Sequence, residues 1–414
     1  MMSCSCYSLT RKLLVTAIAV ALPGMAVAEP TNADLQGQID ALQSQVTALN
    51  TEVNQATEWK NPNTLIHTAG YADVGYVKKE GQDGSFVVGR FAPIFHYQYR
   101  DIVMLEAELE FEVGEDGETE VALEYLTIDW FLNDYAVLVA GKFLSPIGQF
   151  RQNLHPSWIN KLATPPPGFG HDGAAPVSDL GLQVRGGFPF AGMRANYAIY
   201  ASNGPEINAE TEDGIDYELD GVAAEGFNAD VDGEKTFGGR FAILPVASVE
   251  VAVSVAGGKA TVTNVEGEEP PLPPGTVGPV ANQTARDYSV YGADFVWFTG
   301  NMSVRGEFVK TKVGNDRSAG VTASDGATWQ TWYTQVAYRL PNSKWEGALR
   351  YTDYDSPHDS VDIKQAAIGL NYLVTNTFIV KLTHEFNEGK TDQTTGVKYA
   401  TDDDLTVLQL AYGF

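Results

Sequence analysis

The sequence predicts an all-β fold, a transmembrane antiparallel β-barrel of about 16 strands, preceded by a short N-terminal α-helical coiled coil. Three observations carry this prediction. Apolar and polar residues alternate along most of the chain after residue 65, short and long connections follow one another in turn, and the last strand ends on an aromatic residue, Phe414. No mature segment approaches the roughly 18 apolar residues that indicate a membrane-spanning helix.

Residues 1–28 have the features of a secretory signal peptide. Arg11 and Lys12 form a basic region, Leu13–Leu22 is an apolar run, and Ala26-Val27-Ala28 is a small-residue cleavage site. The alternative is a membrane-spanning helix, but this run falls well short of the ~20 residues that a bilayer requires. We therefore expect cleavage after Ala28.

Composition excludes several classes of protein. Both cysteines lie in the signal, so the mature chain has no disulfide and must be stabilised by its core or by barrel closure. The net charge of −26 argues against nucleic acid as a partner, which requires a basic surface. The sequence has no G-x-S-x-G motif, no phosphate loop and no histidine pair with metal-ligand spacing. We expect no enzymatic activity, no cofactor and no metal site.

Residues 29–60 carry a heptad pattern that predicts a periplasmic coiled-coil helix. Apolar residues recur with alternating spacings of four and three, with polar residues between them, at Leu35, Ile39, Leu42, Val46, Leu49, Val53 and Ala56. A single amphipathic helix lying on its own domain is the alternative. The narrow stripe favours self-association, and both a dimer and a trimer remain open.

The strand expected at residues 102–113 alternates most clearly. Its apolar residues take one face, and Glu106, Glu108, Glu110 and Glu112 take the other. In a soluble β-sandwich the glutamates would face solvent, whereas in a membrane barrel they would face a water-filled lumen. This strand alone fits both folds.

The lengths of the connections distinguish between the two folds. Short turns are expected near residues 100–101, 132–134, 189–192, 245–247, 299–301, 341–343 and 374–376. Generally longer connections are expected between them, at 78–84, 114–118, 144–178, 203–235, 259–285, 313–327, 355–360 and 389–402. Strict alternation places all long loops at one end, as in outer-membrane barrels. Residues 61–414 are therefore expected to form the barrel.

The C-terminal segment 405–414 supports the same fold. Leu408, Leu410, Tyr412 and Phe414 alternate on one face, and the segment resembles the C-terminal insertion signal of bacterial outer-membrane proteins. We therefore expect the barrel-assembly machinery to act on this strand. The surrounding lipid and lipopolysaccharide are the other expected partners.

The segment 144–178 interrupts the strand pattern. It carries six prolines and four glycines and has no sustained period. A structureless loop of this length inside a compact domain is either functional or evidence that the strands around it are wrongly assigned. An irregular backbone at membrane depth is tolerated only where it lines a cavity or is buried in protein. We expect this third long loop to fold into the lumen.

Alternation predicts which charged residues face the lumen. One early wall is acidic, and the walls that follow are rich in arginine. The predicted pore and constriction residues are Lys142, Arg151, Lys161, Arg185, Arg194, Arg240, Arg305, Arg339, Arg350, Glu106, Glu108 and Glu110. Opposed charged walls would tune ion selectivity. The alternative is that these charges only solvate the lumen and pair with their neighbours.

The segment Gly141-Lys142-Phe143-Leu144-Ser145-Pro146-Ile147-Gly148 resembles the phosphate-selective porin O/P family, which has a similar Gly-Lys-Phe-x-x-Pro-x-Gly segment before its pore loop. The resemblance implies a trimeric barrel of sixteen strands. It also implies constriction roles for Lys142 and, less directly, for Arg151 and Lys161. Leu144 occupies a position where the family commonly has a second lysine, so the resemblance implies a porin without assigning phosphate as the solute.

We therefore expect an outer-membrane porin that lets small hydrophilic solutes, with anions as one expectation, diffuse passively. The segment 144–178 and the arginine-bearing wall would set its constriction. The alternative is a structural outer-membrane barrel whose coiled coil binds a periplasmic partner.

Overall fold

A computed structural model of the chain describes residues 43–44, 64–114, 116–171, 173–211, 217–230, 232–267, 284–318, 321, 323–392 and 395–414. The chain divides into two units, Met1–Pro62 and Asn63–Phe414. The predicted signal peptide and coiled coil lie outside the described residues, apart from Gln43 and Ser44, which are helical. In the part of the chain that is described, no helix is both long and apolar enough to span a membrane.

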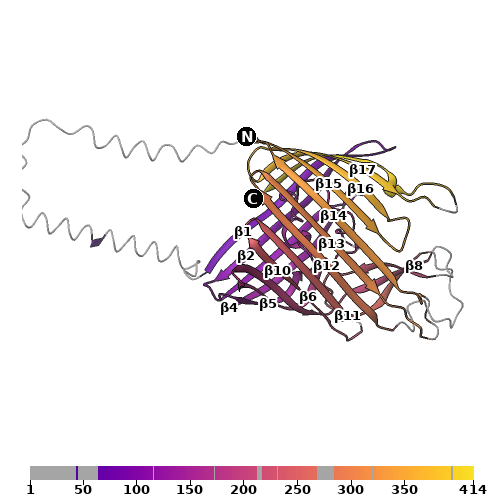
Figure 1. Cartoon of the computed structure of the whole chain (residues 1–414), viewed down its shortest axis with the longest axis horizontal. Helices are drawn as coiled ribbons and strands as arrows, with labels where there is room; N and C mark the ends of the chain where they lie inside the picture. Colours follow the sequence, from indigo (N-terminus) through magenta and orange to yellow (C-terminus); the bar gives the residue numbers. More distant parts are fainter. Residues whose placement is uncertain are drawn as a thin grey trace, which may run out of the picture. The chain divides into compact units, whose positions relative to one another are not determined.

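The second unit is a closed antiparallel barrel of sixteen strands, as the sequence predicts (Figure 1). The strands are β1 (Thr64–Lys79), β2 (Ser85–Tyr99), β3 (Val103–Val113), β4 (Thr119–Asn133), β5 (Ala136–Leu144), β6 (Ser178–Phe190), β7 (Met193–Ser202), β10 (Thr236–Val246), β11 (Val249–Gly267), β12 (Arg286–Thr299), β13 (Met302–Val313), β14 (Ala327–Arg339), β15 (Trp345–Asp355), β16 (Ile363–Leu373), β17 (Phe378–Gly389) and β18 (Leu405–Gly413). The last strand, β18, pairs with β1 and closes the ring.

Short turns and long loops alternate around the barrel, which confirms the predicted order of connections. The short turns between β2 and β3, β6 and β7, and β14 and β15 hold Arg100, Ala191 and Asn342 at positive φ. The long loop-and-hairpin segment between β7 and β10 contains two further strands, β8 (Glu206–Thr211) and β9 (Glu218–Ala223).

One predicted boundary is wrong. A long connection was expected to begin at Lys259, but β11 continues to Gly267. The reason is that β8 pairs in parallel with this extension from Thr261 onward and supplies hydrogen-bond partners beyond the barrel.

Side chains alternate between an apolar outer surface and a polar inner surface. On β15, Leu349 is 59% exposed, whereas its neighbour Arg350 is 3% exposed. Large aromatic side chains such as Trp297, Phe298 and Trp345 are exposed near strand ends. An apolar outer band with aromatic residues at its edges is typical of a barrel that faces lipid.

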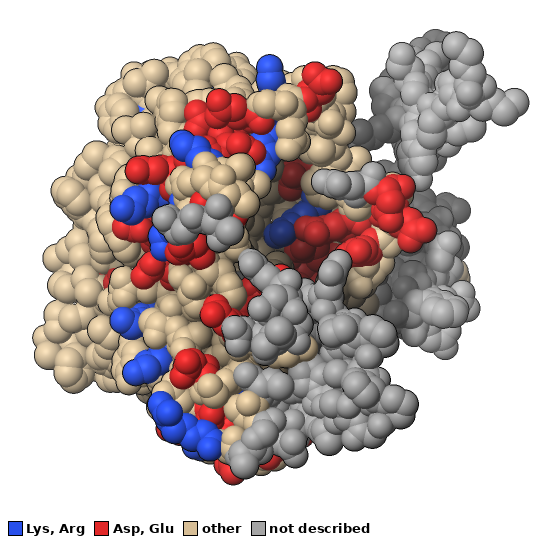
Figure 2. Space-filling view, turned by 90° about the vertical axis from the view of Figure 1, so that its right-hand side faces the viewer, with Lys and Arg blue, Asp and Glu red and all other residues tan. Residues whose placement is uncertain are grey.

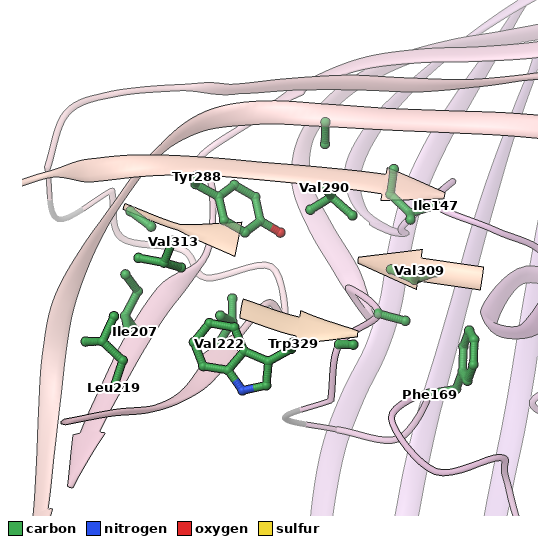
Figure 3. Close-up of a cluster of buried hydrophobic side chains, with 14 of the residues drawn as sticks. Ile147, Phe169, Ile207, Leu219, Val222, Tyr288, Val290, Val309, Val313 and Trp329 are labelled. Carbon is green, nitrogen blue, oxygen red and sulfur yellow. The ribbon is translucent and has the colours of Figure 1, made fainter. Parts of the chain in front are cut away.

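An apolar core occupies part of the interior (Figure 3). Ile147 and Phe169 of the segment between β5 and β6 belong to the same cluster as the inward-facing Val309 and Trp329 of β13 and β14. The β8–β9 hairpin adds further members, Ile207, Leu219 and Val222. This region is called the packed half of the lumen below. Most of its wall residues come from β11–β15, and Val139, Phe143 and Tyr200 of β5 and β7 also belong to it.

Candidate functional site

The long loop, defined as residues 145–177, crosses the interior of the barrel. It leaves the wall at β5 and contacts β13–β17 on the far side. Lys381 Nζ donates hydrogen bonds to the backbone carbonyls of Ser157 and Leu162, the latter at 3.2 Å. Arg350 donates to the Thr164 carbonyl at 2.9 Å, and the Thr331 hydroxyl donates to the Pro167 carbonyl at 2.8 Å. Donors of the wall thus satisfy the irregular backbone of the loop.

The start of the long loop is fixed by a glycine and a carboxylate. The short helix α3 (Phe150–Asn153) begins where the Phe150 amide donates to Glu307 Oε2 at 3.0 Å. Gly148 has φ of +71°, and a Cβ at this position would clash with the Glu307 carboxylate. Glycine is therefore required for the loop to approach β13 this closely.

Beside the long loop lie two cavities that share one residue. The outer cavity, about 360 Å³, includes Arg90, Glu112 and Arg151 and lies towards the long-loop end of the barrel. The inner cavity, about 400 Å³, includes Glu106, Glu108 and Arg185 and lies towards the short-turn end. Figure 2 shows the molecule from the long-loop end, hollowed near the centre, with acidic and basic side chains around the hollow.

His155 is the residue common to both cavities among those described as lining them. The outer cavity shares Thr164, Pro165, Gly170 and His171 with another at the long-loop end, and the inner cavity shares Gln152, Gln183 and Arg185 with one that includes Arg240. Shared lining residues therefore connect the four cavities into one series, which borders the packed half at Phe143, Phe150 and Tyr354.

Charged side chains along this series are mostly paired. Arg90 Nε lies 3.2 Å from Glu110 and 2.6 Å from Glu112. Arg185 lies 2.5 Å from Asp129 and 3.7 Å from Glu106. These contacts join β2, β3, β4 and β6 into one charged wall.

The junction between the two cavities adds a further set of contacts. Arg151 Nη1 lies 3.7 Å from Glu124 Oε1, and burial lowers the pKa of the Arg151 guanidinium while the Glu124 charge opposes that shift. The Tyr71 hydroxyl donates to Glu108 Oε1 at 3.0 Å, and His155 Nε2 lies 3.5 Å from the same oxygen. At the mouth, the hydrogen bond from His171 lowers the pKa of the Glu225 carboxyl.

The wall carries an excess of negative charge. Five of its carboxylates pair with three guanidinium groups, and a sixth, that of Glu108, faces an imidazole. The carboxylates belong to Glu106, Glu108, Glu110, Glu112, Glu124 and Asp129, and the guanidinium groups belong to Arg90, Arg151 and Arg185.

The predicted basic residues of the other walls have different kinds of partner: some pair with carboxylates, and others contact backbone carbonyls or an aromatic ring. Arg240 is paired with Asp294 at 2.6 Å and Glu250 at 2.7 Å, and Lys161 with Glu346 at 3.1 Å. Arg350 binds loop carbonyls, and Arg305 is buried on β13 with its guanidinium over the Phe298 ring.

Seven of the predicted residues line none of the four cavities: Glu110, Lys142, Lys161, Arg194, Arg305, Arg339 and Arg350. Arg194 is exposed at the start of β7, next to a short turn. Arg339 Nε donates to the Ser343 carbonyl within another short turn. Lys142 lies opposite Leu126 and Leu180 in the register and is absent from the residues that line the four cavities.

The sequence reading missed Arg90, Tyr71 and Asp129. Arg90 was missed because β2 contains a bulge, in which Gly89 and Arg90 lie opposite the single residue Asp73. Val88 and Phe91 on either side of the bulge are both exposed outward, so simple alternation fails for Arg90. A glycine within a strand pattern is the sequence signal that could have found the bulge.

No known protein family and no curated protein matches the chain by sequence. Several solved structures match its fold. An anion-selective porin from Comamonas acidovorans has a TM-score of 0.53 and 14% identity, over 85% of this chain and 100% of that one. The structural neighbours of this chain are outer-membrane porins.

Two further neighbours have the same architecture. The loop L8 deletion mutant of OmpT, an outer membrane protein of Vibrio cholerae, has a TM-score of 0.52 and 10% identity, over 85% of this chain and 100% of that one. OmpF of Salmonella typhi, solved in complex with daunomycin, has a TM-score of 0.50 and 13% identity, over 86% of this chain and 99% of that one. At these identities the likeness shows the fold, and membership of the phosphate-selective O/P family stays a prediction.

Proposed function

We propose that the chain is an outer-membrane porin, a passive diffusion channel for small hydrophilic solutes. Three features support this proposal: the closed barrel, its apolar outer face, and the series of cavities with charged linings. Barrels of this size commonly enclose a water-filled channel. In the proposed orientation the short turns face the periplasm and the long loops face outward.

The observation that carries the proposal is the shared lining of the outer and inner cavities. Because both cavities include His155, solute would pass from one to the other beside this side chain. The long loop and the charged wall would then set the constriction. The packed half would carry no flux, because apolar side chains fill it.

The pairing of the charges favours cations over anions at neutral pH. From the sequence, the acidic and arginine-rich walls led us to include small anionic or zwitterionic solutes among those expected. However, Arg240 is neutralised by two carboxylates, and Arg350 is bound to loop carbonyls. The excess carboxylates of β3 and β4 remain, and a row of charge of one sign attracts ions of the other sign.

Reversal potentials across planar bilayers test the proposal. Purified protein should insert and form open channels, and a KCl gradient should yield a potential of the sign given by K⁺ permeation. Anion preference would contradict the proposed selectivity while leaving the channel intact. A complete absence of conductance would favour the structural barrel instead.

The assembly of the protein is also a proposal. We propose a homotrimer in contact with lipopolysaccharide, with β18 and Phe414 presented to the barrel-assembly machinery. Deleting residues 32–55 tests the coiled coil. Persistent trimers and conductance after the deletion would show that the coil is accessory, and loss of both would assign it to assembly.

A further inference from the structure

His155 lies at the point where the outer and inner cavities meet, and its side chain is 6% exposed. It follows α3, so the long loop fixes its position. Its ring is edge-on to that of Tyr71, with centroids 6.1 Å apart. An imidazole held this tightly keeps one orientation towards whatever passes from one cavity to the other.

The hydrogen bonds of His155 determine where its protons are. The ring atom Nδ1 contacts the backbone carbonyl of Arg151, which can only accept a hydrogen bond, so Nδ1 is the donor. In the neutral imidazole the other nitrogen, Nε2, must then carry the lone pair. That lone pair faces Glu108 Oε1 at 3.5 Å.

In the neutral imidazole, no proton lies between His155 Nε2 and the Glu108 carboxylate. Nε2 of His155 and Oε2 of Glu108 are both buried, and neither has a hydrogen-bond partner among the described residues. A proton added to Nε2 would turn the lone pair into a donor directed at the Glu108 carboxylate. The contact would then change from a repulsive one to a charge-assisted hydrogen bond.

Other titratable and charged groups face this site from several strands. The acids and phenols are Tyr71, Asp73, Glu106, Glu110, Glu124 and Tyr125. The cations are Arg90, Arg151, Arg185 and Lys381. Glu106 faces His96 but also lies beside Arg185, whereas Glu108 is the acid of the wall that pairs with an imidazole and with no arginine among the described contacts.

We propose that His155 is the selectivity-determining residue of the pore and that a proton on its Nε2 reduces the preference for cations by neutralising Glu108. The inference rests on the proposed channel function. A proton on Nε2 would add one positive charge beside Glu108, so the preference for cations should fall when the imidazole is protonated.

The first experiment measures the permeability ratio of K⁺ to Cl⁻ at about pH 7.5 and about pH 5.5, which lie within the titration range of histidine. In the unaltered protein the ratio should fall roughly threefold on acidification, because the charge lies well within a Debye length of the ion. His155→Gln should hold the ratio constant between the two pH values. His155→Arg should give the low ratio at both.

Matched controls separate His155 from other groups. His96→Gln and His171→Gln remove imidazoles that pair with Glu106 and Glu225, and both variants should keep the full pH response. Glu110→Gln removes a nearby carboxylate and should also keep it. A response that survives His155→Gln, or that disappears in Glu110→Gln, overturns the proposal.

A second measurement does not depend on conductance. Nitrogen-15 NMR of histidine-labelled protein, with the His155→Gln spectrum as reference, should show Nδ1 protonated at every pH and Nε2 gaining its proton on acidification. A neutral form with its proton on Nε2 overturns the proposal. Absence of conductance in all variants overturns the channel as well, whereas open channels with pH-independent selectivity overturn only the role of His155.

Discussion

The two halves of the lumen are built from the same strand geometry but are filled differently. Towards β11–β15, inward side chains such as Val309 and Trp329 are apolar and pack against the long loop and the β8–β9 hairpin. On β2, β3, β4 and β6, inward carboxylates and arginines line cavities, whereas Val139 and Phe143 of β5 belong to the apolar cluster. The difference teaches that the number of strands sets the width of the barrel but not the width of the open channel. The inward side chains determine how much of the interior remains open.

The largest expected effect comes from breaking the packed half. Trp329 is 1% exposed, and Trp329→Ala should destabilise the protein by about 3–5 kcal/mol through lost burial and a cavity. Trp332 on the same strand is 36% exposed on the outer face, so Trp332→Ala should cost clearly less. Urea unfolding followed by far-UV circular dichroism, which reports on the backbone, measures the loss of stability in both variants. Equal losses would contradict a packed interior.

The anchor of the long loop should give the next largest effect. Lys381→Met leaves the carbonyls of Ser157 and Leu162 without their donor, and the buried one, that of Leu162, should cost about 1–3 kcal/mol when it is unsatisfied. The loop should then move, and single-channel current noise should rise. Lys161→Met, which removes a partly exposed pair with Glu346, is the control. Unchanged current noise in Lys381→Met would argue that Lys381 does not hold the loop in place.

A smaller effect is expected from the charged wall. Arg185 pairs with Asp129 and Glu106 and lines the inner cavity, so Arg185→Gln should raise the cation preference about twofold, because one more carboxylate charge acts within a Debye length. Arg194 lies next to a short turn, and Arg194→Gln should leave reversal potentials almost unchanged. Equal changes would show that both arginines act on the pore.

The smallest effect concerns the mouth, where His171 lowers the pKa of Glu225. A lowered carboxyl pKa means that this contact stabilises the loop fully above the ordinary glutamate value of about 4.3 and is lost as pH falls through the lowered one. Hydrogen-exchange protection of Val177 and Ser178, whose amides bind the Ala224 carbonyl, should decrease in that acidic range. His171→Gln should show the reduced protection already at neutral pH.

Much of the architecture could be predicted because it depends on local patterns. Turn residues and strand lengths recur in order, so the sequence predicts the number of strands and the alternation of connections. The glutamates of β3 could be placed on one face because that strand alternates without interruption from Glu106 to Glu112.

The site was harder to predict because it depends on register and on distant partners. One extra residue in β2 turns Arg90 inward, which no count of alternating residues can detect. The partners of Arg240 and Arg350 lie on other strands or in the long loop, so these contacts could not be predicted from the segments that carry the two arginines. The packed half was not predicted, because alternation assigns apolar side chains to the lipid-facing surface, whereas apolar residues such as Val309 face the interior.

The hydrogen bonds that hold the long loop have an evolutionary consequence. Lys381, Arg350 and Thr331 all bind backbone carbonyls of the loop, and every amino acid carries a carbonyl. Side chains of the loop can therefore be exchanged without loss of these three attachments. A lineage of such proteins, or a designer, could alter the chemistry of the passage residue by residue while the loop stays in place.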